Sequence, residues 1–240
     1  MSTLETRRIE PATASTVTLG AAGETVDISA SQLKTNTIKD AGGNTILTSD
    51  GSGTLSNVNS ALGSGMTLIS SQTASSSASI SFTTGIDSTY DEYVFYCVNM
   101  HPSSDGVVFE WQVSSDGGSS YGMTITSTAY RAYHYESGAY GLSYVAGDDL
   151  AQSTDYQHAI EQVGNDADQS CSGMLQLFSP SSTVSVKTWL STFNTYHTIN
   201  ITINEFTSGY VNSTSAINAI NFRMASGNVD AGTIYMYGIK

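Results

Sequence analysis

One stretch of the chain has the texture of β-structure but too few apolar side chains to form a core. The sequence TIKDAGGNTILTSDGSGTLSNVN, residues 37–59, places isolated apolar residues among Thr, Ser, Asn, Asp and Gly. The surrounding residues 16–68 contain no aromatic side chain, and Gly-rich turn signals separate the short apolar pieces. An isolated hairpin of this kind is marginally stable in water. The region is therefore either disordered or buries its apolar residues against copies of itself.

The regular spacing of these apolar pieces favours association between copies. Val17 and Leu19, and then Val26 and Ile28, alternate with polar residues between glycines. Three chains wound around each other place three such apolar stripes on one axis, and repetitive fibrous proteins form a core in this way. We therefore predict an intertwined, trimeric β-shaft over residues 16–69.

The net charge of the chain excludes several classes of partner. It is −13 at pH 7, so the chain repels phosphate backbones and nucleic-acid binding is not expected. No stretch approaches the roughly 18 apolar residues of a membrane-spanning helix, and no membrane insertion is expected. The opening residues, MSTLETRRIEPATAST, lack the apolar core of a secretory signal. We expect synthesis in the cytoplasm.

Residues 70–240 have a different texture and predict a β-sandwich. After the linker-like SSQTASSSAS, short runs rich in β-branched and aromatic residues recur about every ten residues between Gly, Ser, Asn and Asp. In one run, Val107, Phe109, Trp111 and Val113 alternate with more polar residues. Trp189 is expected in the same core as Trp111. A short helical turn is expected only in DYQHAIEQVG.

The two cysteines and the first fifteen residues give weaker signals. Cys97 and Cys171 lie in apolar, strand-like segments, which predicts buried thiols, with a single disulfide as the alternative. Residues 1–15 are polar and aperiodic, which is typical of a free tail. A docking peptide is the second interpretation, with Arg7, Arg8 and Ile9 as the candidate contacts, because such a tail becomes ordered only on a partner.

Three segments give the chain a resemblance to a known family. TIKDAGGNTILTSDGSGTL resembles the stalk of trimeric bacteriophage tail fibres. SGNVDAGTIYMYGIK and TTGIDSTYDEYVFYCVNMHP are similar to the closing and opening strands of β-sandwich tip domains in virion fibres, including those of marine phages. The resemblance implies an all-β homotrimer in the virion, with a docking tail (1–15), a fibre shaft (16–69) and an antiparallel, jelly-roll-like tip (70–240). It also implies attachment to tail, baseplate, neck or head proteins through the N-terminus.

Tyrosines concentrate in one segment of the predicted tip, and they are the candidate receptor-binding residues. Aromatic rings stack on sugars, and their hydroxyls can form hydrogen bonds. Packing in the sandwich is the alternative for each tyrosine, with one or two of them expected at the surface. Strand alternation places Tyr133 and Tyr135 on one face and Ala132 and His134 on the other. The full candidate set is Tyr130, Arg131, Tyr133, His134, Tyr135, Tyr140 and Tyr144.

The sequence contains no recognisable catalytic or metal-binding motif. Asp148, Asp149, Asp166 and Asp168 form two acidic loops that lack a calcium-loop pattern, and solvated turns are expected. No Gly-x-Ser-x-Gly nucleophile elbow occurs. The four histidines lack metal-ligand spacing, and each is expected to be a turn or strand residue. The available glutamates, Glu110, Glu136, Glu161 and Glu205, are not brought together by sequence spacing as glycoside hydrolysis would require.

These observations predict a non-enzymatic virion fibre without metal or cofactor, whose trimeric tips bind a host surface glycan or outer-membrane receptor. One alternative is a purely architectural head, neck or baseplate protein. A second is a polysaccharide-degrading fibre. A third is a bacterial carbohydrate-binding module, which the missing export signal disfavours.

Overall fold

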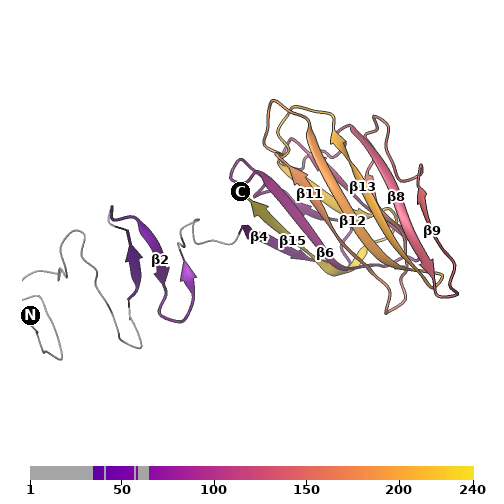
Figure 1. The fold of residues 1–240 in the computed structure, drawn as a ribbon, viewed down its shortest axis with the longest axis horizontal. Coiled ribbons are helices and arrows are strands. Elements are labelled where there is room, and N and C mark those ends of the chain that lie inside the picture. Colours follow the sequence, from indigo (N-terminus) through magenta and orange to yellow (C-terminus); the bar gives the residue numbers. More distant parts are fainter. Residues whose placement is uncertain (1–34, 41, 57, 59–64) are drawn as a thin grey trace, which may run out of the picture. The chain divides into compact units, whose positions relative to one another are not determined.

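The computed structural model describes residues 35–40, 42–56, 58 and 65–240 (Figure 1). The described residues contain no helix and 57% of the structure is β-strand, which confirms the predicted all-β class. The chain divides into two compact units, Met1–Leu62 and Gly63–Lys240. The candidate docking residues Arg7, Arg8 and Ile9 lie outside the described residues.

The smaller unit contains a three-stranded antiparallel sheet in the order β1-β2-β3. Its strands are β1 (Thr37–Lys39), β2 (Thr45–Ser49) and β3 (Leu55–Ser56). The predicted turns separate these strands. The Asp40 carboxylate accepts a hydrogen bond of 2.8 Å from the backbone N–H of Asn44, and Asp50 accepts one of 2.7 Å from that of Ser52. Both aspartates hold their turns through side-chain to backbone bonds, as turn residues commonly do.

The described part of this small sheet has no buried side chain in the single chain. Every described residue from Thr35 to Val58 is exposed or partly exposed, including the apolar residues of β2. This observation agrees with the shortage of apolar residues in the sequence. The trimeric shaft itself remains a prediction.

The larger unit is a twelve-stranded, nearly closed antiparallel sheet. Its strands are β4 (Met66–Thr73), β5 (Ile80–Phe82), β6 (Glu92–Pro102), β7 (Val107–Ser114), β8 (Ile125–Tyr135), β9 (Tyr140–Tyr144), β10 (Gln157–Val163), β11 (Cys171–Phe178), β12 (Lys187–His197), β13 (Ile201–Val211), β14 (Ala219–Met224) and β15 (Val229–Ile239).

The strand pairing divides this sheet into two layers at β12. We call the eight strands β4-β15-β6-β11-β12-β13-β8-β9 the front layer and the four strands β10-β7-β14-β5 the back layer. β12 pairs with β13 over its full length and reaches the back layer only through the pair His197 and Val163 of β10. Figure 1 shows the front-layer strands side by side in this order.

Aromatic side chains join the two layers in one core. Trp111 of β7 meets Trp189 of β12 edge to face, with ring centroids 4.9 Å apart, and both rings are buried. Phe95 of β6 contacts Phe222 of β14 at 5.6 Å, again across the layers. Such pairs are worth about 0.5–1.5 kcal/mol beyond the burial of their area. The predicted core positions of both tryptophans are confirmed.

Two local predictions are wrong. DYQHAIEQVG forms no helical turn, because it contributes β10, which pairs with β7 through contacts such as Gln157 with Trp111. SSQTASSSAS is not wholly a linker, because its first residues lie in β4, which pairs with β15. In both cases pairing with a strand distant in sequence overrides the local pattern.

The two cysteines are buried and carry free thiols, as the sequence predicts. Cys97 lies on β6 and Cys171 on the neighbouring strand β11. Burial raises the pKa of both thiols, because desolvation disfavours the thiolate. Both groups therefore act as small apolar side chains.

Candidate ligand-binding face

The outward face of the front layer is built from strands that pair in unbroken register. β8 pairs with β13, and β13 with β12, over eleven residues each. Because side chains alternate between the two faces of a strand, directly opposed residues align in rows across the layer. Successive rows on one face lie two residues apart, about 6.7 Å along the strand.

One of these rows is rich in aromatic side chains, and we call it the aromatic row. Each residue in it is the direct partner of the next across neighbouring strands. All of them are partly or fully exposed, and Tyr130 and Tyr144 are among the most exposed large side chains of the described structure. From β9 to β15 the row contains Tyr144, Tyr130, Phe206, Thr192, Met174, Tyr96 and Tyr235.

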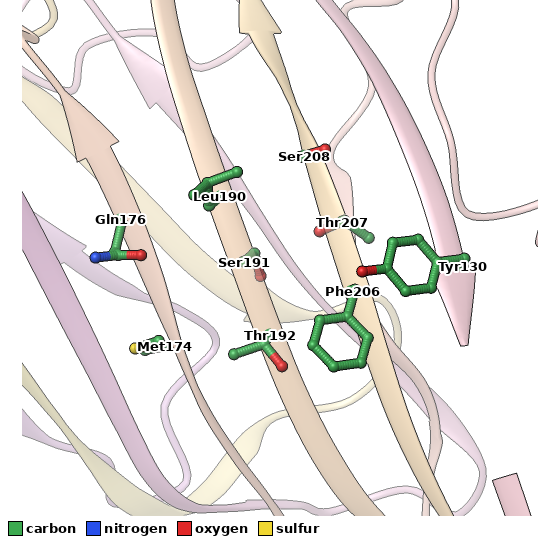
Figure 2. Close-up of a pocket in the computed structure, with 9 residues that line it drawn as sticks. All are labelled: Tyr130, Met174, Gln176, Leu190, Ser191, Thr192, Phe206, Thr207 and Ser208. Atoms are coloured by element: carbon green, nitrogen blue, oxygen red, sulfur yellow. The ribbon is translucent and has the colours of Figure 1, made fainter. Parts of the chain in front are cut away.

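The centre of the aromatic row carries a flat aromatic platform beside an apolar hollow. The rings of Tyr130 and Phe206 are nearly parallel, at 11°, with centroids 5.0 Å apart. Figure 2 shows the two rings next to each other over β8 and β13, with Leu190 and Met174 on the strands beyond. These side chains line an open hollow of about 280 Å³. Leu190 is half exposed, so apolar surface here faces solvent.

The next row along the strands presents amides, and we call it the amide row. Asn194 and Asn204 are direct partners on β12 and β13. The amide nitrogen of Asn194 donates to the Ile203 carbonyl at 2.9 Å, and that of Asn204 donates to the Phe193 carbonyl at 3.2 Å. These bonds fix both amides, and neither side-chain oxygen accepts a hydrogen bond from another described residue. Asn194 is exposed and Asn204 is partly exposed, so both side-chain oxygens are available to a ligand as acceptors.

A third row carries a histidine between aromatic residues, and we call it the histidine row. It contains Tyr140, His134, Thr202 and Tyr196 as successive partners. The rings of His134 and Tyr140 are stacked at 5.8 Å and 10°. His134 Nδ1 lies 2.9 Å from the Tyr135 carbonyl, to which it donates, so Nε2 is left as the free ring nitrogen. Open hollows of about 420 and 330 Å³ lie beside this row.

The outward face is uncharged where these rows cross β8, β11, β12 and β13. Outward positions on these strands contain no Asp, Glu, Lys or Arg. At the margins of the face, Glu136 lines the hollow of about 330 Å³ beside the histidine row, and Glu92 of β6 accepts a hydrogen bond of 2.9 Å from Gln176. This composition is unusual in a chain with a net charge of −13. The face can bind by stacking and hydrogen bonding rather than by ion pairing.

The inward face beneath the same strands contains a buried polar cluster. Arg131 of β8 is the direct partner of Glu205 on β13 and forms an ion pair with Glu161 of β10. Its Nη1 also lies 4.0 Å from Asp148 Oδ2. Glu205 is fully buried and Asp148 is 3% exposed. Buried charges need partners of this kind, because desolvation disfavours an isolated ion.

The buried carboxyl of Glu205 is protonated at neutral pH. Burial, followed by the neighbouring charge of Asp148, raises the pKa of Glu205 from 4.5 to about 9, so its carboxyl is protonated at pH 7. Asp148 Oδ2 and both carboxyl oxygens of Glu205 are buried and have no hydrogen-bond partner among the described residues.

Asp148 also connects this cluster to a polar cleft on the back layer. His158 Nδ1 donates to Asp148 Oδ1 at 2.7 Å, and this bond raises the pKa of His158 despite the opposing effect of burial. His158 Nε2 faces Glu110 Oε2 at 3.9 Å. Glu110 accepts a hydrogen bond of 2.7 Å from Arg223, whose guanidinium lies 3.7 Å from the centre of the Tyr156 ring. The cleft has a volume of about 590 Å³.

The structure separates the predicted receptor-binding residues into two groups. Tyr130, His134, Tyr140 and Tyr144 lie outward in the rows described above. Three others lie inward: Arg131 joins the buried cluster, and Tyr133 and Tyr135 pack against the core. The predicted alternation between His134 and its two tyrosine neighbours is confirmed.

The acidic loops differ from each other. Asp166 and Asp168 are exposed, as solvated turns should be. The same prediction is wrong for Asp148, which is buried because it accepts a hydrogen bond from His158 and faces Arg131. Within the described residues, no group of three or more His, Cys, Asp or Glu is arranged to hold a metal ion.

Sequence reasoning missed the outward residues of β12 and β13. Leu190, Asn194, Asn204 and Phe206 lie outside the tyrosine-rich segment. Their signal is the strict alternation in KTWLSTFNTYH and ITINEFTSGYV, which assigns them to the face opposite Trp189 and Ile203. That alternation does not reveal which strand pairs with β8.

Comparison with known proteins does not assign the chain to a family. No family model, curated protein or solved structure matched it. Over the described residues, no helix combines the length and apolar character needed to cross a bilayer.

Proposed function

We propose that this chain is a non-enzymatic virion fibre protein whose sandwich tip binds glycans on the host cell surface. The observation that carries the proposal is the exposed, uncharged face of the front layer, on which the aromatic row lies next to the amide row. Sugar rings present C–H surfaces to aromatic rings and hydroxyls to amide oxygens. The face presents both kinds of group in rigid strands.

A trimeric assembly accounts for the smaller unit and the N-terminal tail. The described residues of the smaller unit bury no side chain in the single chain, so copies of the chain supply the missing core. Three jelly-roll-like tips on one shaft then bind together. Shallow sites that are weak one by one gain roughly 10²- to 10⁴-fold from such linkage when their geometry fits the surface. The N-terminal tail docks the trimer to the tail, baseplate or neck.

The geometry favours binding over glycoside hydrolysis. The buried cluster contains two carboxyl groups, those of Asp148 and Glu205, and the Glu205 carboxyl is protonated at neutral pH. Both are buried beneath the front layer, however, with exposed fractions of 3% and 0%. A glycosidic bond cannot reach them without opening the sheet, whereas hydrolysis requires carboxyls on either side of that bond. Their role in this proposal is structural.

Adsorption to host cells tests the receptor role. Purified full-length protein should bind host cells and block virion adsorption, and Tyr130→Ala should weaken both effects at least tenfold. Val184→Ala, at an 85% exposed position outside the rows, is the control and should bind like the wild type. If the wild-type protein neither binds cells nor blocks adsorption, the receptor role is wrong and the architectural alternative is favoured.

A further inference from the structure

The three hollows of the front layer follow one another along the strands. The hollow beside the aromatic row is lined by Thr192 and Phe206, and the next by Asn194 and Asn204, two residues further along the same two strands. The third shares Asn194 and Thr202 with the second. From the aromatic row to the histidine row is therefore about 13 Å along β13. We call this series the track.

The length of the track favours an oligomer over a single small molecule. The hollows have volumes of about 280, 420 and 330 Å³, and they open to the same face. A drug-sized ligand occupies one pocket of roughly 300–1,000 Å³ that encloses most of its surface. Shallow hollows in series instead suit an extended chain that makes similar contacts at each position.

The charge of the track selects among such chains. A polymer bearing carboxylate, sulfate or phosphate is bound by Arg or Lys, which hold these groups through charge-assisted hydrogen bonds. Outward positions of β8, β11, β12 and β13 contain neither residue. The marginal carboxylates Glu92 and Glu136, and the net charge of −13, repel an anionic chain further.

The hydrogen-bonding groups exclude an apolar protein surface as the occupant. Asn194 and Asn204 lie in the middle of the track, and their amide nitrogens are committed to backbone carbonyls, which leaves the side-chain oxygens as acceptors. An apolar partner would bury both acceptors without a donor, which costs free energy. A polymer rich in hydroxyl groups supplies donors to these oxygens and C–H faces to the rings of Tyr130 and Phe206.

We propose that the track binds an uncharged polysaccharide chain that runs along β8, β12 and β13 from the aromatic row to the histidine row. This inference rests on the proposed function, because it names the class of glycan recognised at the same face. The chain lies with sugar rings on the Tyr130–Phe206 platform, and its hydroxyls donate to Asn194 and Asn204.

Affinity electrophoresis of the full-length protein tests the inference. The gels contain either uncharged polymers (dextran, mannan, galactan and a β-1,3-glucan) or acidic ones (dextran sulfate and alginate). We expect at least one uncharged polymer to retard the protein and neither acidic polymer to do so. Leu190→Lys, which puts a cation in the first hollow, should weaken that binding at least tenfold. Val184→Lys has the same added charge at an 85% exposed position and should leave the binding unchanged.

The outcomes separate this inference from the proposed function. Binding to acidic polymers only, or binding to an uncharged polymer that Leu190→Lys leaves intact, would overturn the choice of ligand or of site. Retardation by none of the polymers while host cells still bind the protein would overturn the inference and leave the receptor role in place. Failure to bind both polymers and cells would overturn the two together. Thermal unfolding of each variant checks that the fold is retained.

Discussion

Replacing Glu205 with glutamine tests whether Glu205 carries a proton in the folded protein at neutral pH. In the folded protein Glu205 is protonated at pH 7, whereas in the unfolded chain it has an ordinary pKa and is ionised. Folding at neutral pH must therefore take up a proton at this site. Glutamine has nearly the same shape as the protonated acid and is likewise uncharged, but it needs no proton.

The size of the effect follows from the two pKa values of Glu205. Each pH unit above the unfolded value contributes about 1.4 kcal/mol to the cost of protonation. Because the pKa rises from 4.5 in the unfolded chain to about 9 in the folded protein, this cost reaches about 3 kcal/mol at pH 7. Glu205→Gln should therefore raise the free energy of unfolding by about 3 kcal/mol at this pH.

The sign of the pH dependence follows from the raised pKa. The folded state binds this proton more tightly, so the contribution of Glu205 to stability is greatest below its unfolded pKa of 4.5 and falls as pH rises toward about 9. The gain from Glu205→Gln should therefore be small near pH 4.5 and should grow steadily up to pH 9. His158 and Arg131 are present in both proteins and do not produce this difference.

Urea unfolding followed by tryptophan fluorescence measures the effect, because Trp111 and Trp189 are both buried. The wild type, Glu205→Gln and the control Glu136→Gln are compared at pH 5, 7 and 8.5. Glu136 is exposed in the turn after β8, so its replacement should change stability by less than about 0.5 kcal/mol at each pH. The reasoning is refuted if Glu205→Gln destabilises the protein at pH 7, or if its effect does not increase with pH.

Three further predictions concern packing and thiol chemistry. Gly209→Ala would place its Cβ 2.2 Å from the Thr126 carbonyl oxygen and should destabilise the fold by about 1–3 kcal/mol, whereas Gly147→Ala meets nothing within 4 Å and should be neutral; urea midpoints compare the two. Trp111→Ala should cost about 3–5 kcal/mol by calorimetry, because it removes a buried ring from between the layers. The Cys97 thiol should not react with a disulfide reagent until the protein is unfolded, and rapid reaction of the native protein would contradict its burial.

The strands of the larger unit could be predicted because their signal is local. In β7, Val107, Phe109, Trp111 and Val113 are buried as their alternation in the sequence predicts, although Glu110 and Gln112 between them are buried as well. β10 lacks such a pattern. Its register shifts against β7, and Gln162 has a positive φ of 57°, so its side chains do not alternate regularly. The predicted helical turn is wrong for this reason.

The binding face could be predicted only in part. Tyr130 and Tyr140 stand out as aromatic residues in one segment, but Phe206 and Leu190 belong to other segments. Only the pairing of β8 with β13, and of β13 with β12, places these residues in common rows. Register between strands distant in sequence depends on the whole sheet, so a single sequence does not reveal it.

The buried cluster is a stronger case of the same limit. Glu205 and Asp148 lie in a strand and a loop that are 57 positions apart, and Asp148 has the local sequence of a solvated turn. Its burial arises from His158 and Arg131, which approach it from two different strands. No spacing rule connects these positions, because a β-sheet has no fixed sequence separation between partners.

Hydroxyl-radical footprinting tests the central claim that the outward face of the front layer contacts the host surface. The method reports side-chain exposure, and the protein is labelled free and bound to host cell envelope. We predict protection of Tyr130, Leu190 and Tyr140 in the bound state and unchanged labelling of Val184, which is 85% exposed outside the track. Unchanged labelling of the first three residues in envelope-bound protein would contradict the account.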